Sequence, residues 1–447
     1  MHELDILLVQ PPIRDFYFTA KRSIPYGLGC IAASAASAGF SVEILDALAT
    51  SKSRPIQLPP EMAYLRPYYG KPDISPFGLF HQFRHYGYSL THIEQVLRQS
   101  GAQLVGISSL FTPYADDALK IAEIAKRVLP TCKVVLGGHH PTTLPEPTMS
   151  SQAVDFVIRG EGEWALPALA RSLKTGASIQ AVPGIVYRKK DGQLHINPPA
   201  VINELDQIPW PDASRINRKF YRRKTGGSCV VVASRGCPMQ CSYCALGLDS
   251  PLPYRRRRPE SVIHEIEMQV TRHHVRFIDF EDENLSLDKA WFLEILSGIR
   301  DRFGAWDLEL RAMNGLYPAS LDETVIGAMA AVGFKTLNLS LGTICPDQQL
   351  RFQRANVKSA FEQALALAET HGMQAVGYVI ASAPGQSATD SISDLLYLTG
   401  QRVLAGLSIF YPAPGSRDYA RAGKLGLLPA KYSLMRSSAL PIDHTTS

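Results

Sequence analysis

The chain has 447 residues, 46 of them basic and 41 acidic, so its formal net charge is only +5. A chain of this length is expected to fold as two or three domains with a large core, and so weak a charge gives no argument for nucleic-acid binding. Apolar residues make up 45% of the sequence, which excludes global disorder.

Strand and helix patterns alternate through the first part of the chain. Strand signals fall at Asp5–Gln10, Ser41–Leu45, Leu104–Ser108, Lys133–Leu136 and Ala153–Ile158. Between them lie helical patterns at Ile31–Ala38 and Asp116–Leu129, and a third helix that starts at a capping box, Thr91-His92-Ile93-Glu94. This alternation predicts a parallel, doubly wound Rossmann-like sheet, which binds ligands outside the carboxyl ends of its strands.

Residues 51–88 interrupt the alternation with many prolines and aromatic residues. The stretch is too long for an ordinary connection, so we expect either an insert that packs on the second domain or a substrate lid. Residues 179–225 are expected to form a connector, with a β-hairpin around Asp191-Gly192 and a stiff crossing at Pro209-Trp210-Pro211.

A second alternation begins at residue 226. Six strand signals fall at Cys229–Ala233, Phe277–Phe280, Leu308–Ala312, Thr336–Leu341, Ala375–Ile380 and Leu407–Phe410. Six strand–helix units predict a partial parallel barrel, whose site lies at the carboxyl ends of its strands. The expected organisation is therefore a Rossmann-like domain over 1–178, a hairpin and linker over 179–225, and a (β/α)6 barrel with a short tail over 226–447.

Cys237, Cys241 and Cys244 follow the first barrel strand with the spacing Cys-x-x-x-Cys-x-x-Cys. Three thiolates in one loop can converge on a metal centre, but a structural zinc needs four ligands, as does a fully protein-ligated iron–sulfur cluster. On a four-iron cluster, three cysteines leave one iron open to bind another group. The alternative is half of a zinc site, completed by Cys229 or Cys345.

With these motifs the second half of the chain resembles the radical S-adenosylmethionine enzymes. The resemblance implies that Cys237, Cys241 and Cys244 hold a four-iron [4Fe–4S] cluster and that S-adenosylmethionine chelates the open iron. Reductive cleavage would then yield a 5′-deoxyadenosyl radical. It also implies contacts to S-adenosylmethionine from Tyr243, the aromatic residue before the third cysteine, and from residues at or near the strand ends, namely Glu281, Asp282, Asn314 and Ser340. A solvated acidic loop and purely structural polar residues are the alternatives for the last four.

The first half resembles the cobalamin-binding domains found beside such barrels. Ser108 and Leu110 match the Ser-x-Leu after the third strand, and Gly137-Gly138 matches the Gly-Gly after the fourth. The segment Ile24–Gly29 stands where corrinoid carriers have Asp-x-His-x-x-Gly, and it lacks the cobalt-ligating His. A domain that has kept the fold and lost the cofactor therefore stays open. His139 and His140 are expected to be hydrogen-bonded or solvent-facing rather than ligands.

The resemblance is closest to the cobalamin-binding, class B methyltransferase-like group. It implies methylation of an unactivated carbon of a small molecule or natural-product intermediate, with cobalamin as methyl carrier and an electron donor such as flavodoxin or ferredoxin. The alternatives are a radical oxidation, cyclisation or rearrangement without methyl transfer, and a carrier without catalysis. A tRNA methylthiotransferase would need three further cluster cysteines, whereas the first half contains only Cys30 and Cys132.

The acidic start of the chain leads directly into Ile6-Leu7-Leu8-Val9, which indicates a strand and not a signal peptide. The stretch from Gly27 to Phe40 is too short for the roughly 20 residues of a membrane span. Together with the odd count of seven cysteines, these features predict a protein of the reducing cytoplasm. The basic run Arg255-Arg256-Arg257-Arg258 is expected to be a solvated or anion-holding face, not a nucleic-acid patch.

Overall fold

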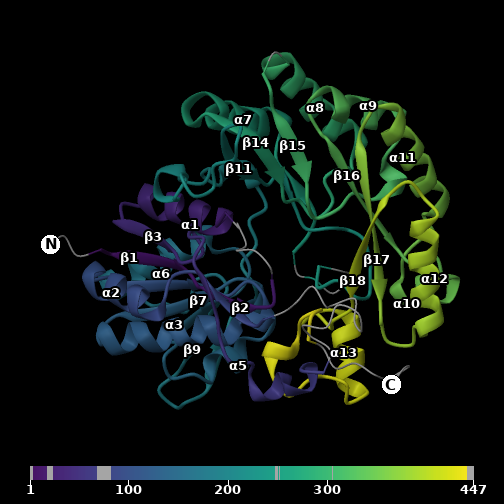
Figure 1. Ribbon diagram of the computed structural model, residues 1–447. Coiled ribbons are helices and arrows are strands. Elements are labelled where there is room, and N and C mark those ends of the chain that lie inside the picture. The colour runs from purple at the N-terminus through teal and green to yellow at the C-terminus, as the bar shows by residue number, and fades with distance from the viewer. Residues whose placement is uncertain are drawn as a thin grey trace. The chain divides into compact units, whose positions relative to one another are not determined.

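A computed structural model of the protein describes residues 4–17, 24–67, 82–246, 250, 252–304 and 306–439. The chain forms two compact units (Figure 1). The first comprises Met1–Ile202, Gln207–Phe220 and Pro429–Leu440, and the second comprises Asn203–Asp206, Tyr221–Leu428 and Pro441–Ser447. The domain limits expected from the sequence stay a prediction, and residues 68–81 of the expected insert lie outside the described ranges.

The first unit is built on a seven-stranded sheet in the order β10-β9-β8-β7-β6-β1-β3. Its strands are β1 (Ile6–Gln10), β3 (Val42–Asp46), β6 (Leu104–Ser108), β7 (Lys133–Gly137), β8 (Phe156–Ile158), β9 (Ile185–Arg188) and β10 (Leu194–Ile196). The strands from β3 to β8 are parallel, and the hairpin β9–β10 adds two antiparallel strands beside β8. The expected hairpin thus continues this sheet, and the strand order reverses between β1 and β6.

Helices cover both faces of this sheet, because its central strands are apolar on both sides. α1 (Tyr26–Ser37) and α6 (Gly162–Thr175) pack on one face, through a core that includes Leu8 and Ile158. α2 (Leu90–Ser100) and α3 (Ala115–Val128) pack on the other, through Val9 and Leu136. Two short helices, α4 (His139–Thr143) and α5 (Pro145–Met149), follow β7. The predicted doubly wound sheet is confirmed.

The loop after β1 and the insert together form a small antiparallel sheet in the order β2-β5-β4. Its strands are β2 (Ile13–Asp15), β4 (Ser53–Pro55) and β5 (Arg84–Tyr86). Leu434 and Ala439, near the carboxyl end of the described chain, share a hydrophobic cluster with Phe16, Met62 and Phe83. The last described segment therefore packs with the first unit.

The second unit carries the predicted partial barrel. Two parallel three-stranded sheets have the orders β11-β14-β15 and β16-β17-β18, and two isolated parallel bridges, Leu310 to Phe334 and Leu316 to Leu339, join them. The strands are β11 (Gly227–Val231), β14 (Val275–Phe280), β15 (Glu309–Ala312), β16 (Thr336–Gly342), β17 (Gln374–Ala381) and β18 (Leu404–Ile409). A short antiparallel pair, β12 (Ser234–Arg235) and β13 (Arg255–Arg256), flanks the cysteine loop.

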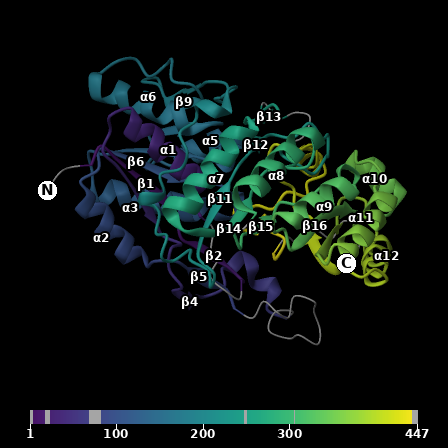
Figure 2. The same cartoon turned by 90° about the horizontal axis from the view of Figure 1, so that it is seen from above.

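Helices lie along the outer side of these strands, as Figures 1 and 2 show. Side chains such as Ile278, Leu310 and Leu339 face these helices in one large core. The helices are α7 (Pro259–His273), α8 (Lys289–Phe303), α9 (Glu323–Ala331), α10 (Pro346–Phe352), α11 (Lys358–Thr370), α12 (Ala388–Thr399) and α13 (Arg417–Lys424). In the part of the chain that the structure describes, no helix combines the length and apolar character needed to cross a membrane.

Some local predictions are wrong at element boundaries. α2 is capped by Ser89, whose side chain accepts a hydrogen bond from His92 N, so the capping box predicted at Thr91 does not form. Ser89 stands closer to the turn at Gly87, and the helix starts as soon as a capping hydroxyl is available. Strand β18 starts at Leu404 instead of Leu407, because its pairing with β17 extends beyond the apolar run.

Candidate functional site

The three cysteines lie in the loop that follows β11, at the carboxyl end of the barrel strands. Gly236 enters this loop with φ 80°, and a Cβ there would come within 2.3 Å of Pro253 O, so only glycine fits. All three thiols are free. Burial raises the pKa of Cys244 to about 11, and the neighbouring Cys241 and Cys237 add to this rise. The three sulfurs thus lie within electrostatic reach of one another.

The acidic segment after β14 holds this loop in place. Both carboxylate oxygens of Asp282, which is buried, accept hydrogen bonds at Ala233 N and at Ser234, whose hydroxyl lies 2.6 Å away. Glu283 accepts a hydrogen bond from Gly236 N at 3.2 Å. Burial raises the pKa of Asp282 to about 7. The contact of Asp282 with S-adenosylmethionine stays a prediction, while in the structure its two oxygens accept hydrogen bonds from Ala233 N and from the amide and hydroxyl of Ser234.

Two other predicted residues, Tyr243 and Ser340, meet at Arg354, a residue that the sequence reasoning missed. Arg354 Nη1 lies 3.1 Å from the Tyr243 hydroxyl and 3.8 Å from Cys241 Sγ. Its Nη2 donates to Ser340 Oγ at 2.9 Å and to Ser340 O. No local pattern marks Arg354, which follows a short helix 113 residues after Cys241.

Glu281 and Asn314 are brought together at the ends of β14 and β15. Asn314 Nδ2 donates to the backbone oxygen of Glu281 at 2.8 Å, which ties the two strand ends to each other. Both residues are exposed. The amide of Asn314 therefore has a structural hydrogen bond, whereas the Glu281 side chain stays available at this edge.

The inner face of the barrel strands is polar. Ile278 and Phe280 face the helices, so Asp279 between them faces inward. Its carboxylate pairs with Arg311 on β15, with Nε–Oδ2 at 3.2 Å, while its buried Oδ1 has no hydrogen-bond partner among the described residues. Asn338 and Tyr378 contact each other in the same interior, with Tyr378 Oη 3.4 Å from Asn338 Oδ1. Barrel interiors are ordinarily filled by branched apolar residues, and an acidic residue inside an apolar strand was a signal that the sequence offered.

The cysteine loop has the donor chemistry of an iron–sulfur cluster. Among the described residues no group of three or more His, Cys, Asp or Glu side chains converges to hold a single metal ion. A four-iron cluster does not require such convergence, because each cysteine binds a different iron. Three free, neighbouring thiols in a loop fixed by Asp282 and Glu283 fit the cluster, and neither Cys229 nor Cys345 completes a four-cysteine zinc set within these ranges.

In the first unit the predicted cobalamin residues lie at the ends of the adjacent strands β6 and β7 and in the loops that follow them. Ser109 N donates to Gly137 O at 2.8 Å, and a Cβ on Gly138, which has φ 109°, would come within 2.8 Å of Ser109 O. A Cβ on Gly137 would meet only Ile158 O, at 3.7 Å. Packing therefore demands glycine at position 138 but leaves open space at position 137.

Polar and apolar groups at these loops fit a large amphipathic ligand. Ser108 ends β6, Leu110 is 52% exposed, and the neighbouring Ser109 has a buried hydroxyl with no partner among the described residues. Open space beside Gly137, an exposed Leu110 and an unsatisfied hydroxyl are features that a bound corrin tail would use.

The loop after β1 offers no imidazole in its described part. In the segment Ile24–Gly29, Tyr26 begins α1, and Gly29 lies against Pro211, where a Cβ would come within 2.8 Å of the proline. His140 is buried, lies 3.2 Å from Thr112 Oγ1 and packs edge-on against Tyr432, as expected for a hydrogen-bonded histidine. Burial lowers the pKa of His140 to about 4, so the ring is neutral.

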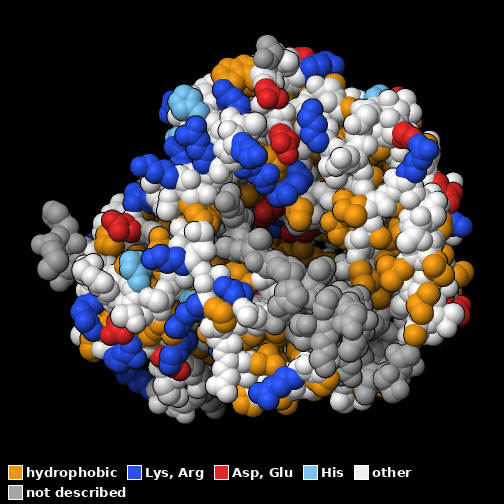
Figure 3. All heavy atoms as spheres, viewed as in Figure 1, with side chains coloured by type: hydrophobic (Ala, Val, Ile, Leu, Met, Phe, Trp, Pro, Cys, Tyr) orange, Lys and Arg blue, Asp and Glu red, His pale blue; other side chains and the backbone are white. Residues whose placement is uncertain are grey.

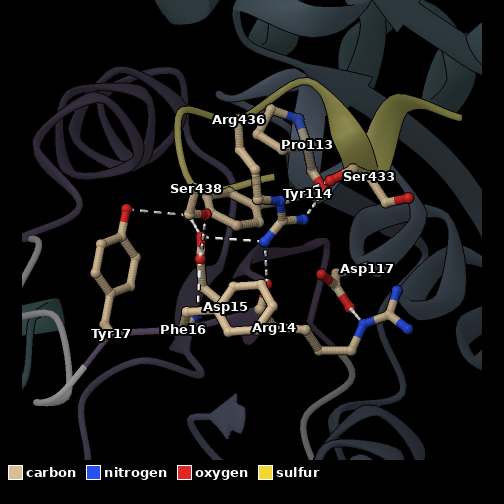
Figure 4. A network of polar contacts seen from close by, with 10 residues as sticks. All are labelled: Arg14, Asp15, Phe16, Tyr17, Pro113, Tyr114, Asp117, Ser433, Arg436 and Ser438. Atoms are coloured by element: carbon tan, nitrogen blue, oxygen red, sulfur yellow. Dashed lines mark hydrogen bonds and ion pairs between the residues drawn. The ribbon is translucent and has the colours of Figure 1, made fainter. Parts of the chain in front are cut away.

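A buried ion pair ties the last described segment to the loop after β1 (Figure 4). Arg436 lies 3.1 Å from Asp15 Oδ2 and donates to the backbone oxygens of Arg14, Pro113 and Ser433. The Tyr114 hydroxyl donates to the same Asp15 carboxylate at 2.5 Å. The segment around Arg436 thus fixes the loops that follow β1 and β6.

A family model described as the B12 binding domain matches residues 80–170. This range contains β6, β7 and β8 with both loops of the predicted cobalamin site, and it begins after the loop that follows β1. The match therefore supports the loops at Ser108 and Gly137 independently of the missing histidine.

Two curated relatives extend the similarity into the barrel. A protein of Pyrococcus horikoshii, described as an uncharacterized methyltransferase, is 27% identical over 366 residues, which cover 80% of this chain and 78% of that protein. An anaerobic magnesium-protoporphyrin IX monomethyl ester cyclase of Rubrivivax gelatinosus is 30% identical over 269 residues, or 58% of this chain and 47% of that protein. The chain thus spans less than half the length of the second relative.

The fold is similar to that of TsrM, a radical S-adenosylmethionine methyltransferase from Kitasatospora setae, whose structure was solved with cobalamin and a [4Fe–4S] cluster bound. The TM-score is 0.72 at 18% identity, over 95% of this chain and 78% of that chain. In its cysteine loop, its B12-binding match and these relatives, the chain is similar to the radical S-adenosylmethionine enzymes that also carry a cobalamin-binding domain.

Proposed function

We propose that the protein is a radical S-adenosylmethionine enzyme that methylates an unactivated carbon of a small molecule in a cobalamin-dependent reaction. A cluster held by the three cysteines would supply the electron that cleaves S-adenosylmethionine to a 5′-deoxyadenosyl radical, and cobalamin on the first unit would supply the methyl group. The observation that carries the proposal is the cysteine loop, fixed by Asp282 and Glu283 at the carboxyl ends of the barrel strands.

The residues around the loop have distinct proposed tasks. Asp282 positions the loop through the backbone of Ser234, and the exposed carboxylate of Glu281 pairs with the methionyl ammonium group. The remainder of S-adenosylmethionine contacts Tyr243 in the cysteine loop, Asn314 after β15 and Ser340 in β16. In the first unit the cobalamin tail binds against Ser108, Leu110, Gly137 and Gly138.

The polar interior of the barrel supports a polar substrate. Asp279 keeps a buried acceptor oxygen without a partner in the described structure, and Tyr378 and Arg311 add hydrogen-bond donors at the same interior. A buried acceptor without a donor is costly, so a substrate with N–H or O–H groups fits this interior better than a hydrocarbon.

Anaerobic reconstitution tests the radical half of the proposal. Wild-type protein should bind about four irons per chain and convert S-adenosylmethionine to 5′-deoxyadenosine and methionine under a strong reductant. Cys241→Ala should lose both properties, whereas Cys345→Ala, which removes a cysteine outside the loop, should lose neither. Unchanged cleavage in Cys241→Ala would contradict the cluster assignment, and loss of metal in Cys345→Ala would favour the zinc alternative.

Cobalamin retention tests the methyl-transfer half. Protein purified with hydroxocobalamin should keep a corrin absorption spectrum after desalting, and Gly137→Leu, which fills the open space beside β7, should lose it. A protein that cleaves S-adenosylmethionine but retains no corrin would instead support radical chemistry without methyl transfer. The missing imidazole in Ile24–Gly29 favours that second function.

The proposal includes a cytoplasmic location, an electron donor such as flavodoxin or ferredoxin, and no nucleic-acid partner. The basic run after the cysteine loop supports the last point, because Arg256 pairs with Asp288, Arg257 with the buried Glu265, and Arg258 with Asp206. In Figure 3 the Lys and Arg side chains over α7 and α8 are interspersed with acidic and apolar ones. These arginines serve the fold of the second unit.

A further inference from the structure

Arg354 places a buried positive charge against the cysteine loop. The residue is 9% exposed, and its Nη1 lies 3.8 Å from Cys241 Sγ. The contact joins a guanidinium to a sulfur that belongs to the proposed cluster. A cation in contact with a ligand sulfur acts on the charge of the whole centre.

The guanidinium is held rigidly. Gln353 turns the chain with φ 52° directly before Arg354, and Gly342, with φ 83°, leaves room for the arginine stem, since a Cβ there would come within 3.2 Å of Arg354 Cδ. The two outer nitrogens of the guanidinium donate hydrogen bonds to the hydroxyls of Tyr243 and Ser340. The position of the charge therefore follows from several contacts and not from one flexible side chain.

One donor of this guanidinium is unused. Arg354 Nε is buried and has no hydrogen-bond partner among the described residues. A buried donor without an acceptor costs free energy, which indicates that packing alone does not explain an arginine here. A site for anionic groups beside Cys241 does explain it.

Glu283 brings a charge of opposite sign to the same loop. Its carboxylate lies in the same loop environment, accepts a hydrogen bond from Gly236 N, and acts electrostatically on Cys237 and Cys244. Arg354 and Glu283 thus bring opposite charges to the cysteine loop, one in contact with Cys241 Sγ and the other hydrogen-bonded to Gly236, the residue before Cys237.

We propose that Arg354 is a positioning residue that raises the reduction potential of the cluster bound by Cys237, Cys241 and Cys244, and that Glu283 opposes it. The inference rests on the proposed function. Taking up one electron makes the cluster and its thiolates more negative by one charge, so a fixed cation stabilises the reduced state and a fixed anion destabilises it. The balance between the two residues sets how readily the centre is reduced before S-adenosylmethionine is cleaved.

The test is a potentiometric titration of the reconstituted protein, followed by the electron paramagnetic resonance signal of the reduced cluster. Arg354→Gln should lower the ratio of reduced to oxidised cluster at a fixed potential at least tenfold, a shift of about −59 mV for one electron. Glu283→Gln, which keeps the acceptor for Gly236 N, should shift the midpoint in the positive direction. Arg354→Lys, which keeps the charge, should lie closer to wild type than Arg354→Gln.

Arg402→Gln is the matched control, because it removes one charge from the same unit at an exposed pair with Glu369, and its midpoint should equal that of wild type. Equal midpoints in wild type and Arg354→Gln, or shifts of the same sign in Arg354→Gln and Glu283→Gln, would overturn the inference. If wild type itself takes up no iron, the proposed function fails. If wild type binds the cluster and the variants do not shift it, only the role of Arg354 fails.

Discussion

Replacing Arg436 by methionine should release the last described segment from the first unit. The side chain is almost fully buried and pairs with Asp15 at 3.1 Å, where the side-chain exposures are 6% and 3%. It also donates to three backbone oxygens, at Arg14, Pro113 and Ser433 (Figure 4). Methionine fills a similar volume but removes every one of these interactions.

The magnitude follows from the charge that is left behind. Breaking a buried ion pair by removing one partner costs about 3–5 kcal/mol, because the other charge stays buried without its counterion. The Tyr114 hydroxyl and Phe16 N still donate to Asp15, so we expect the lower end, about 3 kcal/mol. For a unit of this size the unfolding midpoint should fall by roughly 6–12 °C, at about 2–4 °C per kcal/mol.

Thermal unfolding by circular dichroism measures this shift, and hydrogen exchange over residues 429–439 shows whether the segment is released. Arg402→Met, which breaks a pair with exposures of 86% and 61%, should change the free energy of unfolding by less than about 1 kcal/mol. The double variant Arg436→Met/Asp15→Asn should recover part of the loss, since the second change removes the stranded charge. A shift no larger than that of Arg402→Met, or a double variant less stable than the sum of its parts, would refute the reasoning.

Three further outcomes follow from the site. Burial lowers the pKa of His140 to about 4, so below pH 6.5 the unfolded chain gains a proton that the folded chain does not. The free energy of unfolding of the wild type should therefore fall by about 2 kcal/mol between pH 6.5 and 5. Urea titrations should show a weaker pH dependence of this free energy in His140→Gln. Gly138→Ala, forced to φ 109° against a backbone oxygen, should lower the unfolding midpoint through about 1–3 kcal/mol of strain, whereas Gly137→Ala should fold normally; equal midpoints would contradict the packing argument. Asp282→Ala should reduce the iron content after reconstitution, because two backbone N–H groups and a hydroxyl lose their acceptor, while Glu281→Ala should leave iron unchanged.

Much of the architecture could be predicted because its signals are local. The alternation of apolar strands and amphipathic helices predicts both the doubly wound sheet and the six barrel strands. The periods of 2 and 3.6 residues on which it depends involve only residues close together in the sequence. Cys237, Cys241 and Cys244 lie within one loop, so their spacing indicates a metal centre, and the resemblance to radical S-adenosylmethionine enzymes implies that it is a cluster. Ser108 and Gly138 are identified by resemblance to the motifs of cobalamin-binding domains, and strand order predicts only that their loops lie at the same edge of the sheet.

The rest depends on contacts between residues far apart in the chain. Arg354 reaches Cys241 across 113 residues, and Arg436 reaches Asp15 from the opposite end of the sequence; no periodicity marks either arginine, because its role comes from what folding places beside it. Asp282 shows the same limit from the other side. Its acidic character could be read from the sequence, but only the fold decides that its two oxygens accept hydrogen bonds from Ala233 and Ser234, just before the cysteines. Residue types and local spacing therefore determine which reactive groups this protein offers. Tertiary packing decides which charges lie beside the cysteine loop and which form the ion pairs that stabilise the surrounding chain.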